Sequence, residues 1–333
     1  MVQAEQGSRK QSTMLGGQAV LEGVMMRAPG MIATAVRRAD GSITIRKDPY
    51  APLGGRFPIF KIPILRGAAG LIEMLILGIK TLNWSAEVAL LDGESGSNGK
   101  PAAQKKKGHS MELGLTVALS LLGGLALFFA APLYLTTQFF AFDQQPLLFN
   151  FVAGLIRVTI FLGYLGALSF MKDIRRLFQY HGAEHKTVFA QEKGETLTVE
   201  SCRRQSRFHP RCGTSFLLVV LVTAIILFAL WDALLIGWVG EITVFLRLGT
   251  HLALLPLIMG VSYEFIRFSA RHADTPIGRL VVLPGLLLQR VTTKEPDDRQ
   301  IEVAVAALRA ALGQDTMRDG VAAAVQSQAI SVN

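Results

Sequence analysis

Four long apolar runs constrain this chain more than any other feature of its sequence. They cover residues 113–135, 149–171, 213–238 and 244–268. Each approaches or exceeds the roughly 20 residues that an α-helix needs to cross the hydrocarbon core of a bilayer. The sequence therefore predicts a membrane protein that is mainly α-helical, with a bundle of four transmembrane helices between residues 112 and 275.

Ionisable side chains interrupt these runs at a few positions. Arg157, Asp232 and His251 lie well inside their runs, and such side chains normally face a bundle interior or a wet cavity. We therefore weigh an interhelical network among them. Arg247 and Glu264 lie nearer to helix ends, where we expect their charged groups to reach the membrane interface.

The composition agrees with a membrane protein and argues against a nucleic-acid partner. Half of the residues, 50%, are hydrophobic, only 18% are charged, and the mean hydropathy is +0.38. Ordinary soluble proteins carry about 25% charged residues. The net charge of +9 comes from basic residues that flank the apolar runs, which indicates contact with the lipid bilayer rather than with nucleic acid.

The distribution of basic residues predicts the orientation of the spans. The connections at residues 136–148 and 239–243 hold no Lys or Arg, whereas the middle loop at residues 172–212 holds nine. Both terminal regions are also rich in basic residues. Because loops rich in Lys and Arg stay in the cytosol, we expect the middle loop and both termini there.

Residues 14–91 read as a small cytosolic or interfacial α+β region. Residues 31–37 and 42–47 alternate apolar and polar side chains around Asp40-Gly41, which predicts a β-hairpin. Residues 62–91 read as a helix whose four charges lie seven residues apart along one side. We expect this helix in the interface or packed under the bundle, since a fifth span would upset the charge asymmetry.

The remaining segments are assigned by composition. The sequence predicts a short helix at the end of the C-terminal segment and an apolar stretch along the membrane surface before it. The segments are a polar tail at 1–13, a disordered Gly/Ser/Lys linker at 92–111, a C-terminal cytosolic or interfacial segment at 276–312, and a flexible tail at 313–333.

The middle loop carries the residues that could perform chemistry. His181 and His185 lie one helical turn apart on an otherwise apolar stripe, which lets two imidazoles meet one metal ion. With Glu184 they form H-x-x-E-H, the inverzincin pattern, in which two His bind zinc and Glu is the base. His209 and Cys212, just before the third apolar run, could complete the ligand set.

Several interpretations of this loop stay open. Mixed imidazole and thiolate ligands favour zinc, and four protein ligands would make a structural site whereas three plus water would make a catalytic one. Cys202 could replace Cys212, although a buried apolar role suits it as well. Two His on a helix face can also form a hydrogen-bonded core cluster, or act as acid and base without a metal.

Arginines in the same loop and a glycine-rich block near the N-terminus are less specific. Arg211 and its neighbours suit lipid headgroups, or a clamp for phosphate or carboxylate. Residues 16–27 lack the phosphate-binding P-loop pattern, so their glycines indicate close backbone packing instead. Glu22 would be a metal ligand or base only if the fold brought it to the loop.

Four blocks of sequence together resemble the YqhQ-like family. They are GGQAVLEGVMMR, YHGAEHKTV, SRFHPRCGTSF and PGLLLQRVTTKEPDDRQIEVA. This family groups bacterial membrane proteins of unknown function that are labelled as predicted metal-dependent enzymes. The resemblance implies a bacterial inner-membrane location and the same five loop residues as site candidates, and it adds Gln18, Glu22 and Arg27.

Two functions follow from these expectations. The first is a zinc-dependent membrane hydrolase in which Glu184 activates water. The second is a non-enzymatic adaptor that binds another membrane protein complex and uses a structural metal or His cluster as a brace. A transporter is disfavoured, because the sequence shows no inverted repeat. The sequence does not fix the substrate or the oligomeric state.

Overall fold

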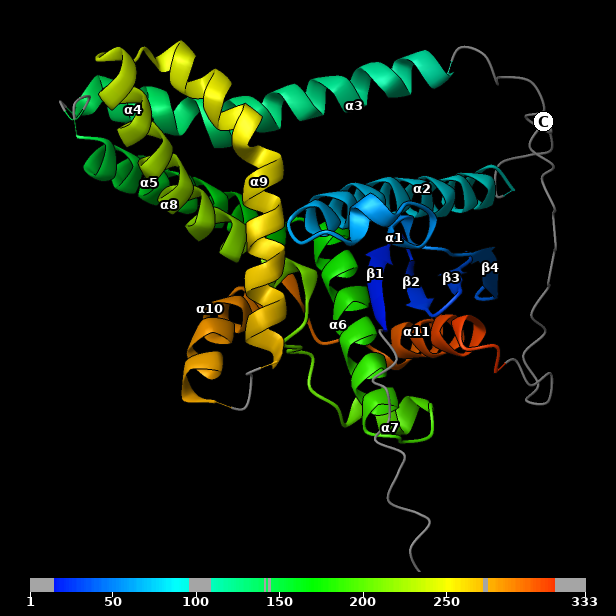
Figure 1. The fold of residues 1–333 in the computed structure, drawn as a ribbon. Coiled ribbons are helices and arrows are strands. Elements are labelled where there is room, and N and C mark those ends of the chain that lie inside the picture. Colours follow the sequence, from blue (N-terminus) through cyan, green and yellow to red (C-terminus); the bar gives the residue numbers. More distant parts are fainter. Residues whose placement is uncertain (1–14, 96–108, 141, 143–144, 272–274, 315–333) are drawn as a thin grey trace, which may run out of the picture.

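The computed structural model describes residues 15–95, 109–140, 142, 145–271 and 275–314 (Figure 1). Helices dominate these residues, and four of them are long and apolar enough to cross a membrane. A small antiparallel sheet forms near the start of the chain. The predicted mainly helical architecture with an α+β N-terminal region is confirmed at this level.

The sheet has four strands in the order β1-β2-β3-β4, each antiparallel to its neighbour. The predicted hairpin is confirmed as β3 and β4, with Gly41 at positive φ in its turn. The glycine-rich block forms a second hairpin that the sequence did not reveal, because β2 is buried on both faces and shows no alternation. The strands are β1 (Gly16–Val20), β2 (Gly23–Ala28), β3 (Met31–Arg37) and β4 (Ile43–Pro49).

Helices cover both faces of the sheet (Figure 1). On one face, α6 (Lys172–Glu192) and α11 (Asp298–Ala311) share a buried core with the strands. On the other face, Val20 and Val36 pack against Val88 and Trp84 of α2 (Leu65–Ser95). The N-terminal region, the middle loop and the C-terminal helix therefore form one body.

The four candidate spans match the predicted apolar runs. They are Ala118–Phe139, Pro146–Ser169, Gly213–Val239 and Val244–Ser269. The first combines α3 (His109–Leu125), a π-helical turn η2 (Ala126–Ala130) and α4 (Ala131–Phe139), and the others lie in α5 (Pro146–Ser169), α8 (Gly213–Val239) and α9 (Val244–Arg271). Pro132 in the first span lacks the N–H that would bond the Phe128 carbonyl, and Arg157 Nε donates to that oxygen at 2.8 Å instead.

The helix α2 is not among the four candidate spans, and it packs against α9 instead. A Cβ on Gly67 would lie 2.6 Å from Tyr263, so the two helices approach closely there. Arg66 forms a two-pronged ion pair with Glu264. Glu264 therefore pairs with Arg66 of a neighbouring helix.

A polar cluster lies inside the bundle around Asp232, which is fully buried. Its carboxylate accepts from Asn150 Nδ2 at 2.8 Å and from His251 Nε2 at 3.0 Å. Arg247 Nε lies 3.3 Å from the same carboxylate, and the guanidinium stacks over Phe149. Arg247 is 1% exposed, so the expectation that it reaches the interface was wrong.

The shorter elements connect the sheet to the bundle. They are α1 (Leu53–Arg56), the 3-10 turn η1 (Pro58–Lys61), α7 (Val199–Arg203) and α10 (Pro276–Thr292). The segment expected to be a linker is shorter than 92–111, since α2 includes Asp92 and α3 begins at His109. The rest of that linker, the tail at 1–13 and most of the tail at 313–333 lie outside the described residues.

Candidate metal centre

The helix α6 presents the two loop histidines to one point, as their spacing predicts. It is a separate helix rather than a continuation of α5, because Phe170 and Met171 interrupt the helical conformation between the two. Met171 has ψ 132°, which turns the chain out of the helical path. This break lets α6 leave the bundle and pack against the sheet (Figure 1).

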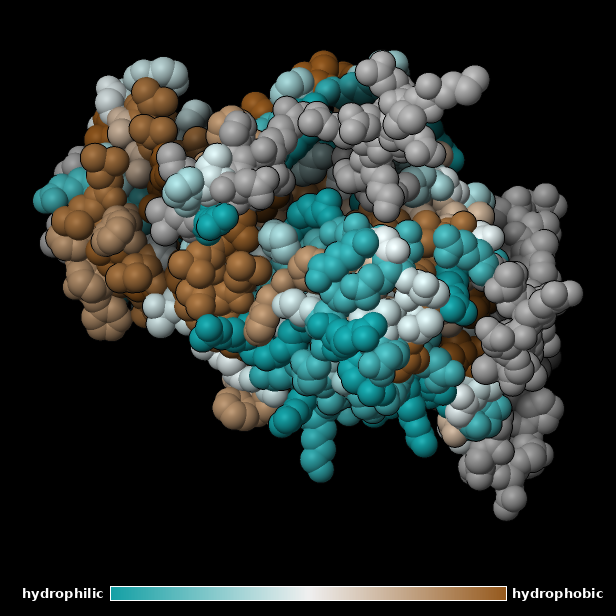
Figure 2. Space-filling model, turned by 90° about the horizontal axis from the view of Figure 1, so that it is seen from below, coloured by the Kyte–Doolittle hydropathy of each residue, from teal (hydrophilic) through white to brown (hydrophobic). Residues whose placement is uncertain are grey.

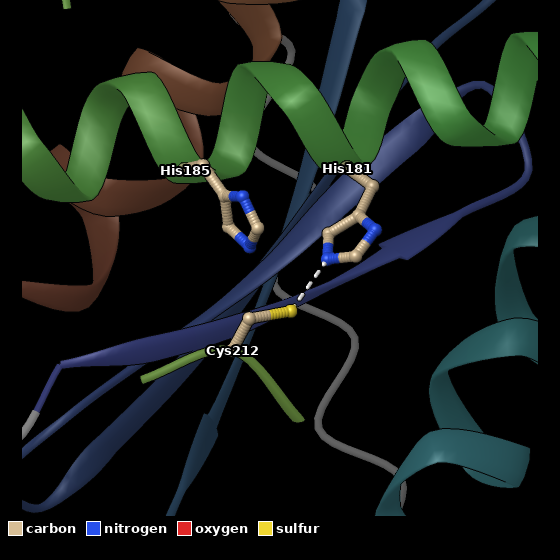
Figure 3. Close-up of side chains that lie close together, drawn as sticks. All are labelled: His181, His185 and Cys212. Atoms are coloured by element: carbon tan, nitrogen blue, oxygen red, sulfur yellow. Dashed lines mark hydrogen bonds between the residues drawn. The ribbon is translucent and has the colours of Figure 1, made fainter. Parts of the chain in front are cut away.

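His181, His185 and Cys212 converge at the end of the bundle (Figure 3). One ligand atom from each lies within 4.8 Å of the others, and they are the one such group of three found in the described part of the chain. The imidazole rings of the two histidines lie 4.4 Å apart. His181 Nε2 lies 3.2 Å from Cys212 Sγ.

Backbone carbonyls fix the tautomer of both histidines. His181 Nδ1 donates to the Thr292 carbonyl at 2.8 Å, and His185 Nδ1 donates to the Arg207 carbonyl at 2.5 Å. A carbonyl can only accept, so each Nδ1 carries a proton, and in a neutral ring the lone pair is then on Nε2. Hydrogen bonds from the second ring nitrogen to a carbonyl orient the histidine ligands of metals.

The Nε2 atom of His185 is buried and has no hydrogen-bond partner among the residues that the structure describes. Burial lowers the pKa of His185, so the ring stays neutral near pH 7. A buried lone pair without a donor is costly, and a metal ion would satisfy it. The donor set of two imidazoles and one thiol therefore fits zinc.

Cys212 lies at the N-cap of α8, where its sulfur accepts from the Thr214 backbone amide at 3.4 Å. The thiolate is the form of cysteine that binds metals. Cys202, the alternative ligand, lies in the core beneath the sheet and is fully buried. Burial raises the pKa of its thiol, as expected for a cysteine that acts as a small apolar residue.

Glu184 lies beside the three candidate ligands, with Oε2 3.4 Å from His185 Nε2. Burial raises the pKa of this carboxyl, while His181 and a backbone hydrogen bond from Gly17 offset part of that rise. A Cβ on Gly17 would lie 2.6 Å from Glu184 Cγ. The first strand thus approaches so closely only because residue 17 is glycine.

His209 and Arg211 lie next to the centre, but both side chains contact the carboxylate of Glu192. The His209 ring is 5.6 Å from that of His185. Its Nδ1 accepts from the Arg211 backbone amide at 3.2 Å, and its Nε2 lies 3.4 Å from Glu192. The Arg211 side chain forms an ion pair with Glu192. Both nitrogens of His209 therefore have partners other than the centre.

The three N-terminal candidates serve contacts between elements in this structure. Glu22 forms an ion pair with Arg176 and accepts from the Tyr180 hydroxyl at 3.2 Å, so it joins the first turn to α6. Gln18 packs against Gly78 of α2. Arg27 donates to the Tyr50 hydroxyl at 3.3 Å and to Met74. None of the three reaches the ligand group.

The end of α10 holds the loop that carries the centre, and sequence reasoning missed this role. Gln289 is fully buried, accepts from His209 N at 2.8 Å and donates to His209 O at 2.8 Å. The Thr293 carbonyl accepts from Arg207. Contacts to backbone groups do not depend on residue type, so the sequence carries no sign of them. A Gln inside an apolar helix could, however, have indicated a role for Gln289.

Comparisons with known proteins place these features in one family. A family model described as a protein of unknown function (DUF1385) matches residues 62–314. The chain is 37% identical over 295 residues to the uncharacterized protein YqhQ of Bacillus subtilis (strain 168), an alignment that covers 87% of this chain and 89% of that protein. No solved structure matches the chain.

Proposed function

We propose that this chain, which belongs to the YqhQ-like DUF1385 family of proteins of unknown function, is a multi-pass bacterial membrane protein that binds zinc. His181, His185 and Cys212 would hold the ion, and Glu184 would make the centre hydrolytic. The observation that carries the proposal is the convergence of these three donors with both Nδ1 atoms bonded to carbonyls.

The packing supports a location in the cell membrane with both termini in the cytosol. The sheet, α6 and α11 share one core, so the N-terminal region, the middle loop and the C-terminal segment lie on one side of the bundle. An even number of spans returns the chain to the side on which it started, and the structure has four candidate spans. The two connections on the far side hold no Lys or Arg. The basic residues of the shared side favour the cytosol as its location.

The position of Glu184 supports hydrolysis. Zinc held by three protein ligands would act as a Lewis acid and would lower the pKa of a bound water to about 7. The Glu184 carboxylate lies beside His185 Nε2, where it can take a proton from water and give it to a leaving group. Its raised pKa brings it closer to the pH at which such transfer is efficient.

Metal analysis of purified full-length protein tests the proposal. We expect about one zinc per chain, as for a single site of this donor set. His185→Gln should release the zinc, whereas His209→Gln should retain it because both nitrogens of His209 already have partners in Arg211 and Glu192. If gently purified protein contains no zinc, or if the two variants contain equal amounts of zinc, the assignment is contradicted.

Burial of the centre favours a second function, a non-enzymatic adaptor whose metal only braces the loop. His185 is 2% exposed, Glu184 6% and Cys212 9%. Cobalt substitution separates the two functions. If the metal has a free coordination position, azide should change the visible spectrum of the cobalt protein. If the protein fills every position, azide should leave the spectrum unchanged. Glu184→Gln should keep cobalt in both cases.

A further inference from the structure

The helix α10 has two faces with different chemistry. Its buried face carries Gly285, which packs against Ser215 so tightly that a Cβ would lie 2.4 Å from that side chain. Its exposed face carries Arg279, Leu283, Leu287 and Arg290, at spacings of four, four and three residues. These four residues, the α10 outer stripe, share an arc of about 80° on a helix with 3.6 residues per turn.

The α10 outer stripe has the pattern of a helix that rests on a lipid surface. Leu283 is 46% exposed and Leu287 47% exposed, with an arginine on either side of them. The helix holds no Asp or Glu, and neither arginine forms an ion pair with another described residue. Two exposed leucines with an exposed arginine before and after them suit acyl chains flanked by anionic headgroups.

The stripe also continues the surface of the bundle. The exposed residues of the last span include Phe265 and Phe268, near its cytosolic end and shortly before α10 in the chain. In Figure 2, hydrophobic residues cover the bundle and the part of the view where α10 lies, while hydrophilic residues gather over the body formed by α6, α7 and α11. Lipid rather than a soluble partner therefore fits this face.

The buried face of the same helix holds the metal centre in place. Gln289 forms hydrogen bonds with both backbone groups of His209 and with Ser215 at 3.1 Å. The Thr292 carbonyl at the end of α10 fixes the tautomer of His181. A displacement of α10 must therefore alter the orientation of a zinc ligand.

We propose that anionic phospholipid headgroups bind the α10 outer stripe and that this contact stabilises the metal centre. The coupling rests on the zinc site proposed above, whereas the lipid contact does not. Each basic side chain near an anionic surface strengthens association by about five-fold, so two give at most about 25-fold.

The test uses the full chain in nanodiscs of phosphatidylglycerol or of phosphatidylcholine. We expect amide hydrogen exchange of residues 276–292 to be slower in phosphatidylglycerol, by up to about 25-fold. Zinc release to a chelator should slow in the same lipid. Arg279→Gln combined with Arg290→Gln should abolish both lipid effects. The control is Arg299→Gln, which changes an exposed arginine on α11 and should preserve both effects.

Unchanged exchange of α11 amides shows that the double variant is folded. Equal exchange of α10 in the two lipids overturns the lipid contact. Lipid-dependent exchange with lipid-independent zinc release overturns the coupling. If the protein holds no zinc, the proposed function fails, and exchange of α10 in the metal-free protein still decides the lipid contact.

Discussion

Replacing Asp232 by asparagine removes the charge at the centre of the polar cluster and keeps the shape of the side chain. Asp232 is fully buried, and Asn150, Arg247 and His251 converge on it from two other helices. Asparagine can still accept from His251, but it removes the carboxylate charge that lies 3.3 Å from Arg247 Nε. Removing one partner of a buried ion pair costs about 3–5 kcal/mol.

A loss of this size lowers the melting temperature by roughly 10 °C for a chain of a few hundred residues. Thermal unfolding in detergent, followed by near-ultraviolet circular dichroism, measures it. Glu241→Gln is the control, because Glu241 is exposed at the same end of the bundle. Adding Arg247→Gln to Asp232→Asn should recover part of the loss. An Asp232→Asn protein within about 0.5 kcal/mol of the parent would refute the reasoning, since that is the scatter of ordinary surface substitutions.

Three further predictions concern the metal centre. Cys212→Ala should lower zinc affinity by at least about 100-fold, while Cys202→Ala leaves it nearly unchanged, as measured by competition with a chromophoric chelator; equal effects would contradict the ligand choice. Burial lowers the pKa of His185 below its ordinary 6.5, so the unfolded chain binds more protons and the metal-free protein should lose stability as pH falls from about 7 to about 5. His185→Gln should flatten that dependence in denaturant titrations, and an unchanged slope would rule out this residue as its source. Gly17→Ala should destabilise the protein by about 1–3 kcal/mol because its Cβ meets Glu184, whereas Gly70→Ala, in open space on α2, should not.

The membrane helices could be predicted because their signal is local. A run of apolar residues specifies a span without any knowledge of its neighbours. The partners of Arg247 and Glu264 are different, because they depend on which helices pack together. Position near a helix end favoured the interface, but the tertiary arrangement gave Arg247 a buried carboxylate and Glu264 a partner on α2.

The sheet shows a similar division. The hairpin around Asp40-Gly41 alternates in the sequence because β4 has an exposed face. The first hairpin does not, since helices cover both sides of β2 and five of its six residues are buried, with Arg27 the one half-buried exception. Glu22 adopts a positive φ of 52° in the turn, where glycine or asparagine is the usual signal.

The candidate site could be predicted in its side chains but not in its supports. Helical spacing placed His181 beside His185, and both converge with Cys212. His209 looked equivalent in the sequence, yet local hydrogen bonds turn its nitrogens toward Arg211 and Glu192. The carbonyls of Thr292 and Arg207 belong to every residue type, so no pattern could mark them.

X-ray absorption at the zinc edge of the purified protein tests the central claim most directly. The account predicts one sulfur scatterer at about 2.3 Å and two imidazole nitrogens at about 2.0–2.1 Å. The sulfur should disappear in Cys212→Ala and persist in Cys202→Ala. A spectrum without a sulfur ligand, or with a sulfur that survives Cys212→Ala, would contradict a centre built from His181, His185 and Cys212.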